Sequence, residues 1–80
     1  MSAVTADQLR YAYYLDELRT DIHRALKSAR RRDRWMVKAR RYKAEGFVEG
    51  VSLCVKYARD LNRDVRFWTR EAMTDMRQAR

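Results

Sequence analysis

Residues 47–72 read FVEGVSLCVKYARDLNRDVRFWTREA. Apolar side chains recur through this stretch in alternating steps of four and three residues, an average period of about 3.5, which places them along one side of an α-helix that packs lengthwise against a partner. They are Phe47, Val51, Cys54, Ala58, Leu61, Val65, Trp68 and Ala72. The stripe continues to Val37 and Ala44 on one side and to Ala79 on the other, with Arg40 and Asp75 as polar interruptions.

A second stripe with the same period precedes it. Its members are Tyr11, Leu15, Leu18, Ile22, Ala25 and Ala29. Thr5 and Gln8 have the spacing of a capping box, and Asp7 falls in the first turn, where the helix dipole favours an anion, so a helix is predicted to begin at about residue 6. The chain has no proline and only two glycines, which is typical of an all-helical protein.

The two stripes differ in phase by one residue, which predicts a break in the helix between Arg30 and Val37. Three arginines, Arg30 to Arg32, suit the negative end of a closing helix, and Asp33 is an acceptable N-cap for the next one. The leading prediction is therefore a helix over about 6–31, a turn near 31–34 and a long helix over about 34–78. In that hairpin Tyr11, Tyr13 and Tyr14 would face Gly50, Ser52 and Cys54.

Two other layouts remain open. Gly46 follows several basic residues, as a glycine at a helix C-terminus often does, so the turn could instead lie near 45–50. Asn62 and Asp64 could also end one helix and cap a third, giving a three-helix bundle. Against the third helix, the stripe passes through Leu61 and Val65 without losing phase.

The length of 80 residues favours a single helical domain, 1–80. We expect an all-α fold, a long antiparallel helical hairpin with heptad seams, packed into a dimer or a higher helical bundle. The reason for the oligomer is that a second helix much longer than the first would lack cover within its own chain. The residues predicted to form the oligomer interface are Phe47, Val51, Leu61, Val65, Trp68, Ala72 and Met76.

The net charge of +8 is concentrated in one quarter of the chain. Residues 24–43 contain ten lysines and arginines against one acid, Asp33, whereas the flanking segments are nearly neutral. A local concentration of positive charge favours polyanions or acidic protein surfaces as partners. Arginine outnumbers lysine, which suits bidentate phosphate contacts but is equally expected from a GC-rich genome.

Six of these basic residues follow one another at steps of three and four, so a continuous helix would align them in a ridge about 26 Å long. The candidate contacts are Arg24, Lys27, Arg31, Arg34, Lys38 and Arg41. A turn at 31–34 would instead gather them at the tip of the hairpin. Trp35 and Tyr42 interleave with the block and could stack on bases, although an aromatic beside a seam is more often part of the core edge.

The sequence contains no pattern typical of an enzyme. One cysteine and one histidine are too few for a structural zinc site, and paired carboxylates and glycine-rich phosphate loops are absent. Cys54 lies on the apolar stripe, where a buried inert thiol is expected, and His23 lacks a recognisable catalytic partner. We therefore expect a non-enzymatic protein with no cofactor, no metal and no small-molecule substrate. Without a signal-like or membrane-spanning segment, a cytoplasmic location is expected.

The leading functional hypothesis is a small helical protein whose basic block, 24–43, contacts nucleic-acid phosphates with low sequence specificity. The alternative is a protein-binding module or inhibitor, of the kind carried by phages and mobile elements, that docks helix to helix on an acidic partner. A third hypothesis is a structural coiled-coil assembly element.

Overall fold

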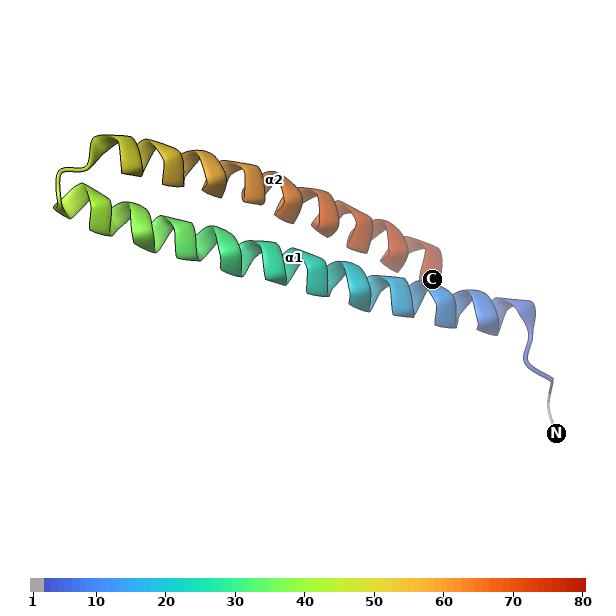
Figure 1. Cartoon of the computed structure of the whole chain (residues 1–80). Coiled ribbons are helices and arrows are strands. Elements are labelled where there is room, and N and C mark those ends of the chain that lie inside the picture. The colour runs from blue at the N-terminus through green and yellow to red at the C-terminus, as the bar shows by residue number, and fades with distance from the viewer. Residues whose placement is uncertain (1–2) are drawn as a thin grey trace.

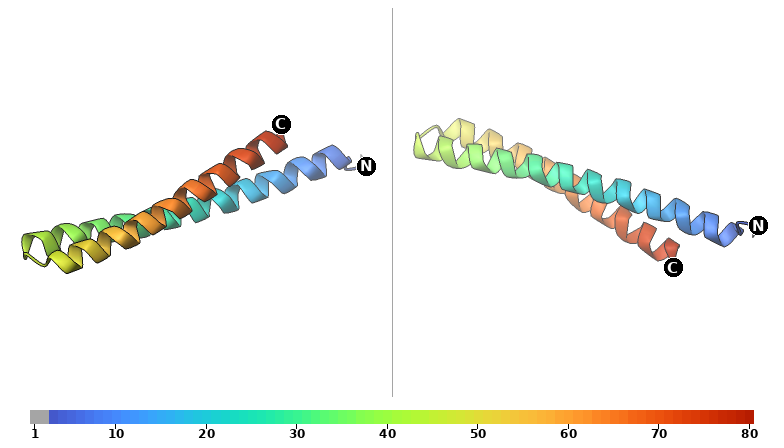
Figure 2. Two further views of the ribbon diagram at one scale, coloured as in Figure 1. Left: turned by 90° about the horizontal axis from the view of Figure 1, so that it is seen from above. Right: turned by 90° about the horizontal axis from the view of Figure 1, so that it is seen from below.

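The computed structural model describes residues 3–80 and consists of two α-helices, α1 (Ala6–Ala44) and α2 (Val48–Ala79). The helices lie side by side in opposite directions and are joined by residues 45–47 (Figures 1 and 2). The rod measures 68 × 19 × 12 Å, so it is a single layer of two helices. This confirms the expected all-α antiparallel hairpin.

The start of α1 agrees with the sequence. Gln8 N–H donates to Thr5 Oγ1 at 3.2 Å, and Thr5 N–H donates to Gln8 Oε1 at 2.9 Å. These reciprocal bonds satisfy two backbone donors that have no partner within the helix. The predicted capping box is therefore present, with Asp7 in the first turn.

The turn is a Schellman motif centred on Gly46. This glycine has a φ of +76°, a left-handed conformation that side chains disfavour. Phe47 N–H donates to the carbonyl of Tyr42 at 2.9 Å, and Gly46 N–H donates to that of Lys43 at 3.1 Å. The ring of Phe47 then packs edge-on against that of Tyr42, with the centroids 5.2 Å apart. Together these contacts end α1 and reverse the chain.

The leading prediction of a turn near 31–34 is wrong. The chain is helical throughout that segment, and the Asp33 carboxylate accepts a hydrogen bond from Arg32 Nε at 3.1 Å instead of capping a new helix. Arginine is a good helix former, so a basic run alone does not stop a helix. The alternative turn within 45–50 is the correct one, because glycine can adopt the conformation that ends α1. The three-helix layout is also wrong, since α2 continues through Asn62 and Asp64.

The position of the turn sets which residues face each other. Trp35 packs on Tyr57 at 4.8 Å between ring centroids, and Arg32 Nη1 donates to Asn62 Oδ1 at 2.9 Å. The tyrosines at 11–14 were therefore placed wrongly opposite Gly50, Ser52 and Cys54. They lie near the C-terminal end of α2, where Arg10 Nη2 donates to Gln78 Oε1 at 3.2 Å. Gly50 instead faces the rings of Tyr42 and Phe47.

Each helix contributes one seam of buried and half-buried residues to the contact between them. The α1 seam consists of Tyr14, Leu18, Asp21, Ala25, Ser28, Arg32, Trp35, Ala39 and Tyr42. The α2 seam consists of Gly50, Cys54, Ala58, Leu61, Val65, Trp68, Ala72, Asp75 and Ala79. The fully buried apolar residues are all small, namely Ala39, Cys54, Ala58 and Ala72, so the helices approach closely over a thin core.

Candidate functional site: a basic ridge on α1

The six predicted contact residues lie on one continuous helix. Each of them immediately precedes a residue of the α1 seam, so all six point to the same side of the hairpin. The structure therefore aligns Arg24, Lys27, Arg31, Arg34, Lys38 and Arg41 in a line about 26 Å long. We call this line the basic ridge.

Arg24 is already engaged within the hairpin. Its Nη1 lies 3.2 Å from Asp21 Oδ1, and its guanidinium lies 4.5 Å from the centre of the Trp68 ring. A carboxylate and an aromatic face both stabilise a guanidinium, so Arg24 ties α1 to α2. It is consequently the member of the ridge least able to contact an external anion.

The other five ridge residues have no carboxylate within ion-pair distance anywhere in residues 3–80. Lys38 Nζ lies over the rings of Trp35 and Tyr42, at 5.4 and 5.7 Å from their centres. The guanidinium of Arg41 lies 5.9 Å from the centre of the Tyr42 ring. Aromatic faces orient a cation without neutralising it, so these side chains retain their charge for a partner.

Two shallow hollows follow the ridge. One has a volume of about 590 Å³ and is lined by His23, Lys27, Arg30, Arg31 and Arg34. The other, of about 290 Å³, is lined by Arg31, Arg34, Trp35 and Lys38. Arg31 and Arg34 border both hollows, so an anion seated in either hollow would lie beside these two guanidinium groups. Such a surface attracts phosphate or carboxylate groups and holds them through charge-assisted hydrogen bonds.

The aromatic residues of the basic block are half-buried. Trp35 and Tyr42 belong to the α1 seam, where they contact Tyr57 and Phe47 of the facing segment. A groove of about 390 Å³ lies between Trp35, Lys38 and Tyr42 of α1 and Leu53 and Tyr57 of α2. The sequence analysis did not single out Leu53 and Tyr57 of this groove, which are 49% and 40% exposed.

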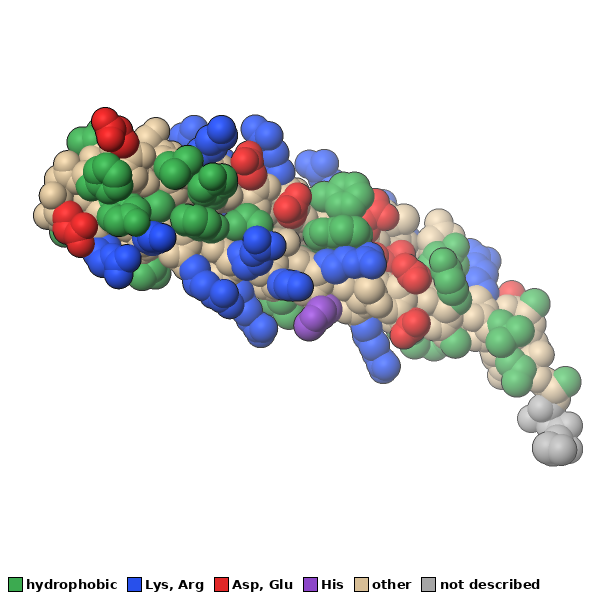
Figure 3. Space-filling model, in the orientation of Figure 1, with side chains coloured by type: hydrophobic (Ala, Val, Ile, Leu, Met, Phe, Trp, Pro, Cys, Tyr) green, Lys and Arg blue, Asp and Glu red, His purple; other side chains and the backbone are tan. Residues whose placement is uncertain are grey.

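A second line of basic residues runs along the outer side of α2, opposite its seam. It contains Lys56, Arg59, Arg63, Arg66, Arg70 and Arg77. Figure 3 shows lysines and arginines along both long edges of the molecule, with hydrophobic and acidic side chains between them. The sequence analysis missed this line because the acids of α2 cancel its charge in a window count. The spacing of three and four residues from Lys56 to Arg70 would have revealed it.

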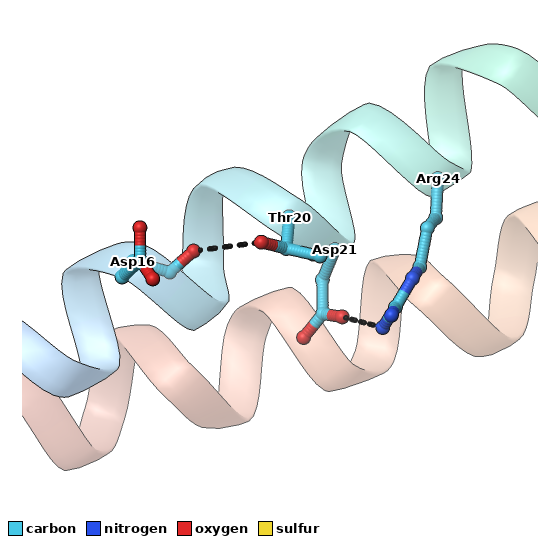
Figure 4. A network of polar contacts seen from close by, with 4 residues as sticks. All are labelled: Asp16, Thr20, Asp21 and Arg24. Atoms are coloured by element: carbon cyan, nitrogen blue, oxygen red, sulfur yellow. Dashed lines mark hydrogen bonds and ion pairs between the residues drawn. The ribbon is translucent and has the colours of Figure 1, made fainter.

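Two buried aspartates face each other across the seams. Asp21 is 4% exposed and Asp75 is 8% exposed. Figure 4 shows the Asp21 carboxylate directed towards α2 with Arg24 beside it. A hydrogen bond with Asp21, burial and the negative charges of Asp21, Glu17 and Glu71 raise the pKa of Asp75 from 3.8 to about 6. Asp75 Oδ2 is buried without a hydrogen-bond partner. The sequence analysis recorded Asp75 only as an interruption and missed Asp21.

The residues predicted to form an oligomer interface are mostly covered by α1. Ala72 is buried, and Val51, Leu61, Val65 and Trp68 are half-buried within the hairpin. The argument that they lack cover is therefore wrong, because α1 extends alongside them once the turn lies at 45–47. Phe47 and Met76 remain 47% and 46% exposed.

The other chemistry-bearing side chains show no assembled site. Cys54 is a buried free thiol, as the stripe predicted, and His23 is exposed at the edge of the ridge. Across residues 3–80 no three metal-ligating side chains come together. Neither α1 nor α2 has an apolar stretch long enough to cross a membrane. No protein-family model, curated protein or solved structure matches this chain.

Proposed function

We propose that the protein is a nucleic-acid-binding protein that contacts phosphates through the basic ridge, with low sequence specificity. The observation that carries this proposal is the line of five exposed or half-exposed basic residues on α1 without acidic partners in residues 3–80. The five residues from Lys27 to Arg41 span about 21 Å, a length that runs beside about six phosphates of one strand of a duplex. Salt-dependent binding of a polyanion follows from this arrangement.

Low specificity follows from the side-chain types and their setting. The ridge offers guanidinium and ammonium groups on the side of a rod, which suit phosphate contacts that fix position and carry no sequence information. The ridge residues are all arginine or lysine and bring no carboxylate, thiol or hydroxyl group to this surface, which supports a non-enzymatic role.

The proposal is tested by reversing charge on the ridge and, as a control, on the outer side of α2. The ridge variant carries Arg31→Glu, Arg34→Glu and Lys38→Glu. The control carries Arg59→Glu, Arg70→Glu and Lys56→Glu, which removes the same residue types and the same net charge from exposed positions. Fluorescence anisotropy with labelled duplex and single-stranded oligonucleotides at one low salt concentration should show that the ridge variant loses binding and that the control retains most of it.

Equal loss in both variants would show that net charge alone drives binding, and the ridge would have no special role. Absence of binding by the unmodified protein at low salt would contradict the proposal and direct the search to an acidic protein partner.

A further inference from the structure

Exposed aromatic rings of α2 lie on the same side of the hairpin as the basic ridge. Residues that immediately precede the seams form this side on both helices, and we call it the ridge face. On α2 it includes Tyr57 and Phe67, and the groove that Tyr57 shares with Lys38 of α1 shows that the two rows lie together. Residues that immediately follow the seams form the opposite face, and none of those in the described chain is aromatic. The combination of cations with exposed rings therefore distinguishes the ridge face.

Two adjoining hollows give this face a cationic part and an aromatic part. The hollow of about 290 Å³ is lined by Arg31, Arg34, Trp35 and Lys38, and the groove of about 390 Å³ extends from Trp35 and Lys38 to Tyr57. Because Trp35 and Lys38 line both, the hollow and the groove are neighbours. The groove falls within the range of ~300–1,000 Å³ found for sites that hold small organic groups. A phosphate held by the two arginines would thus lie next to a planar group held in the groove.

Tyr57 is the ring best placed to stack on that planar group. It packs on Trp35 with the ring centroids 4.8 Å apart and an angle of 39° between the ring planes. Trp35 is half-buried and Lys38 Nζ lies over its ring, whereas Tyr57 is exposed. A ring that is held by one neighbour and still exposed is already ordered, so a second ring can stack on it at little cost in side-chain entropy.

The two helices carry opposite charge along the ridge face. The α1 row from Arg24 to Arg41 is the basic ridge, whereas the α2 row contains four acids and no lysine or arginine from Glu49 to Glu71. The members of the α2 row are Glu49, Leu53, Tyr57, Asp60, Asp64, Phe67 and Glu71. Phosphates are therefore attracted to the α1 side of this face and repelled from the α2 side. A strand lying along the face would place its backbone on α1 and turn its bases towards Tyr57.

We infer that the ridge face holds single-stranded nucleic acid, with phosphates on Arg31, Arg34 and Lys38 and a base stacked on Tyr57. This inference rests on the proposed function and makes its ligand more specific. The bases of a single strand are free to stack on aromatic rings, and every base has a face that can stack, which agrees with low sequence specificity. A duplex pairs and stacks its bases internally, so it offers no base face to the groove and binds through its phosphates alone.

The first part of the test asks whether the bases contribute to binding. Fluorescence anisotropy compares three labelled probes of equal length, namely oligothymidylate, an abasic strand with the same phosphates, and a duplex. The unmodified protein should bind oligothymidylate about 10-fold or more tighter than the abasic strand, the factor expected from one stacked base. This comparison needs no variant, so it does not depend on whether a variant folds.

The second part of the test asks whether Tyr57 is the stacking residue. Tyr57→Ala should weaken the binding of oligothymidylate by about 10-fold and leave the binding of the abasic strand and the duplex unchanged. Tyr57→Phe keeps the ring and should bind like the unmodified protein. Tyr13→Ala is the matched control, because Tyr13 is also exposed and packs on one neighbouring ring, that of Tyr14. Tyr13 lies about 33 Å along α1 from Trp35, so its replacement should not change the binding of any probe.

The abasic strand separates a failure of this inference from a failure of the proposed function. Equal binding of oligothymidylate and the abasic strand, or equal losses in Tyr57→Ala and Tyr13→Ala, would overturn the stacking site while leaving phosphate binding by the ridge intact. Absence of binding to all three probes at low salt would contradict the proposed function itself, and the inference with it.

Discussion

Replacement of Asp75 by asparagine should stabilise the hairpin at neutral pH. Asp75 of α2 is buried against Asp21 of α1. Glu17 of α1 and Glu71 of α2 add negative charge nearby. Arg24 pairs with Asp21 and not with Asp75. These surroundings raise the pKa of Asp75 from 3.8 to about 6. Asparagine keeps the size of the side chain, removes its charge, and offers an N–H donor to Asp21 in place of the carboxyl proton.

The expected magnitude follows from the change in pKa. A rise of about two units corresponds to about 3 kcal/mol of unfavourable free energy when the carboxyl is ionised. Above the folded pKa of about 6 this cost is present in full. Between pH 6 and 3.8 the folded protein binds more protons than the unfolded chain, so the stability contributed by this group rises as pH falls. The gain from Asp75→Asn should therefore be largest at pH 8, up to about 3 kcal/mol, and should vanish near pH 4.

Urea unfolding followed by circular dichroism, at one fixed chain concentration and several pH values from 4 to 8, measures this difference. Asp64→Asn is the control, because Asp64 is an exposed acid of α2 without an ion pair in the described chain, and its replacement should change little at any pH. The reasoning is refuted if Asp75→Asn is neutral or destabilising at pH 8, or if its effect does not change with pH.

Three further predictions concern the ends of the helices and the core. Gly46→Ala should lower the free energy of unfolding by about 1 kcal/mol in urea titrations, because the left-handed conformation at φ +76° disfavours a Cβ even though open space surrounds it. An unchanged free energy of unfolding would contradict the need for glycine at this position. Thr5→Ala should remove the capping box at a cost of about 1 kcal/mol to the first turn, visible as faster amide exchange near residues 6–9 and not in residues 30–40. Cys54, which is 1% exposed, should react with a thiol reagent only as fast as the hairpin opens, so addition of urea should accelerate labelling. Rapid labelling in buffer without urea would contradict the burial of this thiol.

The helical class and the seam of α2 could be predicted from the sequence. Cys54, Ala58, Leu61, Val65, Trp68 and Ala72 all lie on that seam, because a heptad spacing of apolar residues leaves little choice of face. The start of α1 was equally predictable, since Thr5 and Gln8 form a local motif that needs no tertiary contact.

The seam of α1 was not predictable from apolar spacing. Its actual members include Asp21, Ser28 and Arg32, and two of these polar residues meet polar partners, Asp75 and Asn62, on α2. Only part of the predicted stripe lies on that seam: Leu18 and Ala25 belong to it, whereas Leu15 and Ile22 each lie one residue beyond a seam member. The difference in phase between this stripe and the α2 stripe was interpreted as a sign of a turn. It arises instead because part of the stripe lies on a different face of the continuous helix α1.

The candidate site was predicted in part. The line of basic residues depends only on helical spacing, so a continuous α1 produces the ridge as described. The contact of Arg24 with the Trp68 ring depends on which residues of α2 lie opposite it. It could not be predicted without knowing the position of the turn. The basic line on α2 was not predicted because acids on a neighbouring side of the same helix cancel its charge when residues are counted along the chain. Helical spacing separates the basic residues from these acids, whereas composition does not.

The salt dependence of nucleic-acid binding by the unmodified protein tests the central proposal most directly. Five ridge residues without acidic partners in residues 3–80 should neutralise about five phosphates, so log K against log salt should fall with a slope of about −4.5 on duplex and about −3.5 on a single strand. A slope in this range, lost in the ridge variant, is the predicted result. Binding that does not weaken with salt, or no binding at all at low salt, would contradict the assignment of the ridge as a phosphate-binding surface.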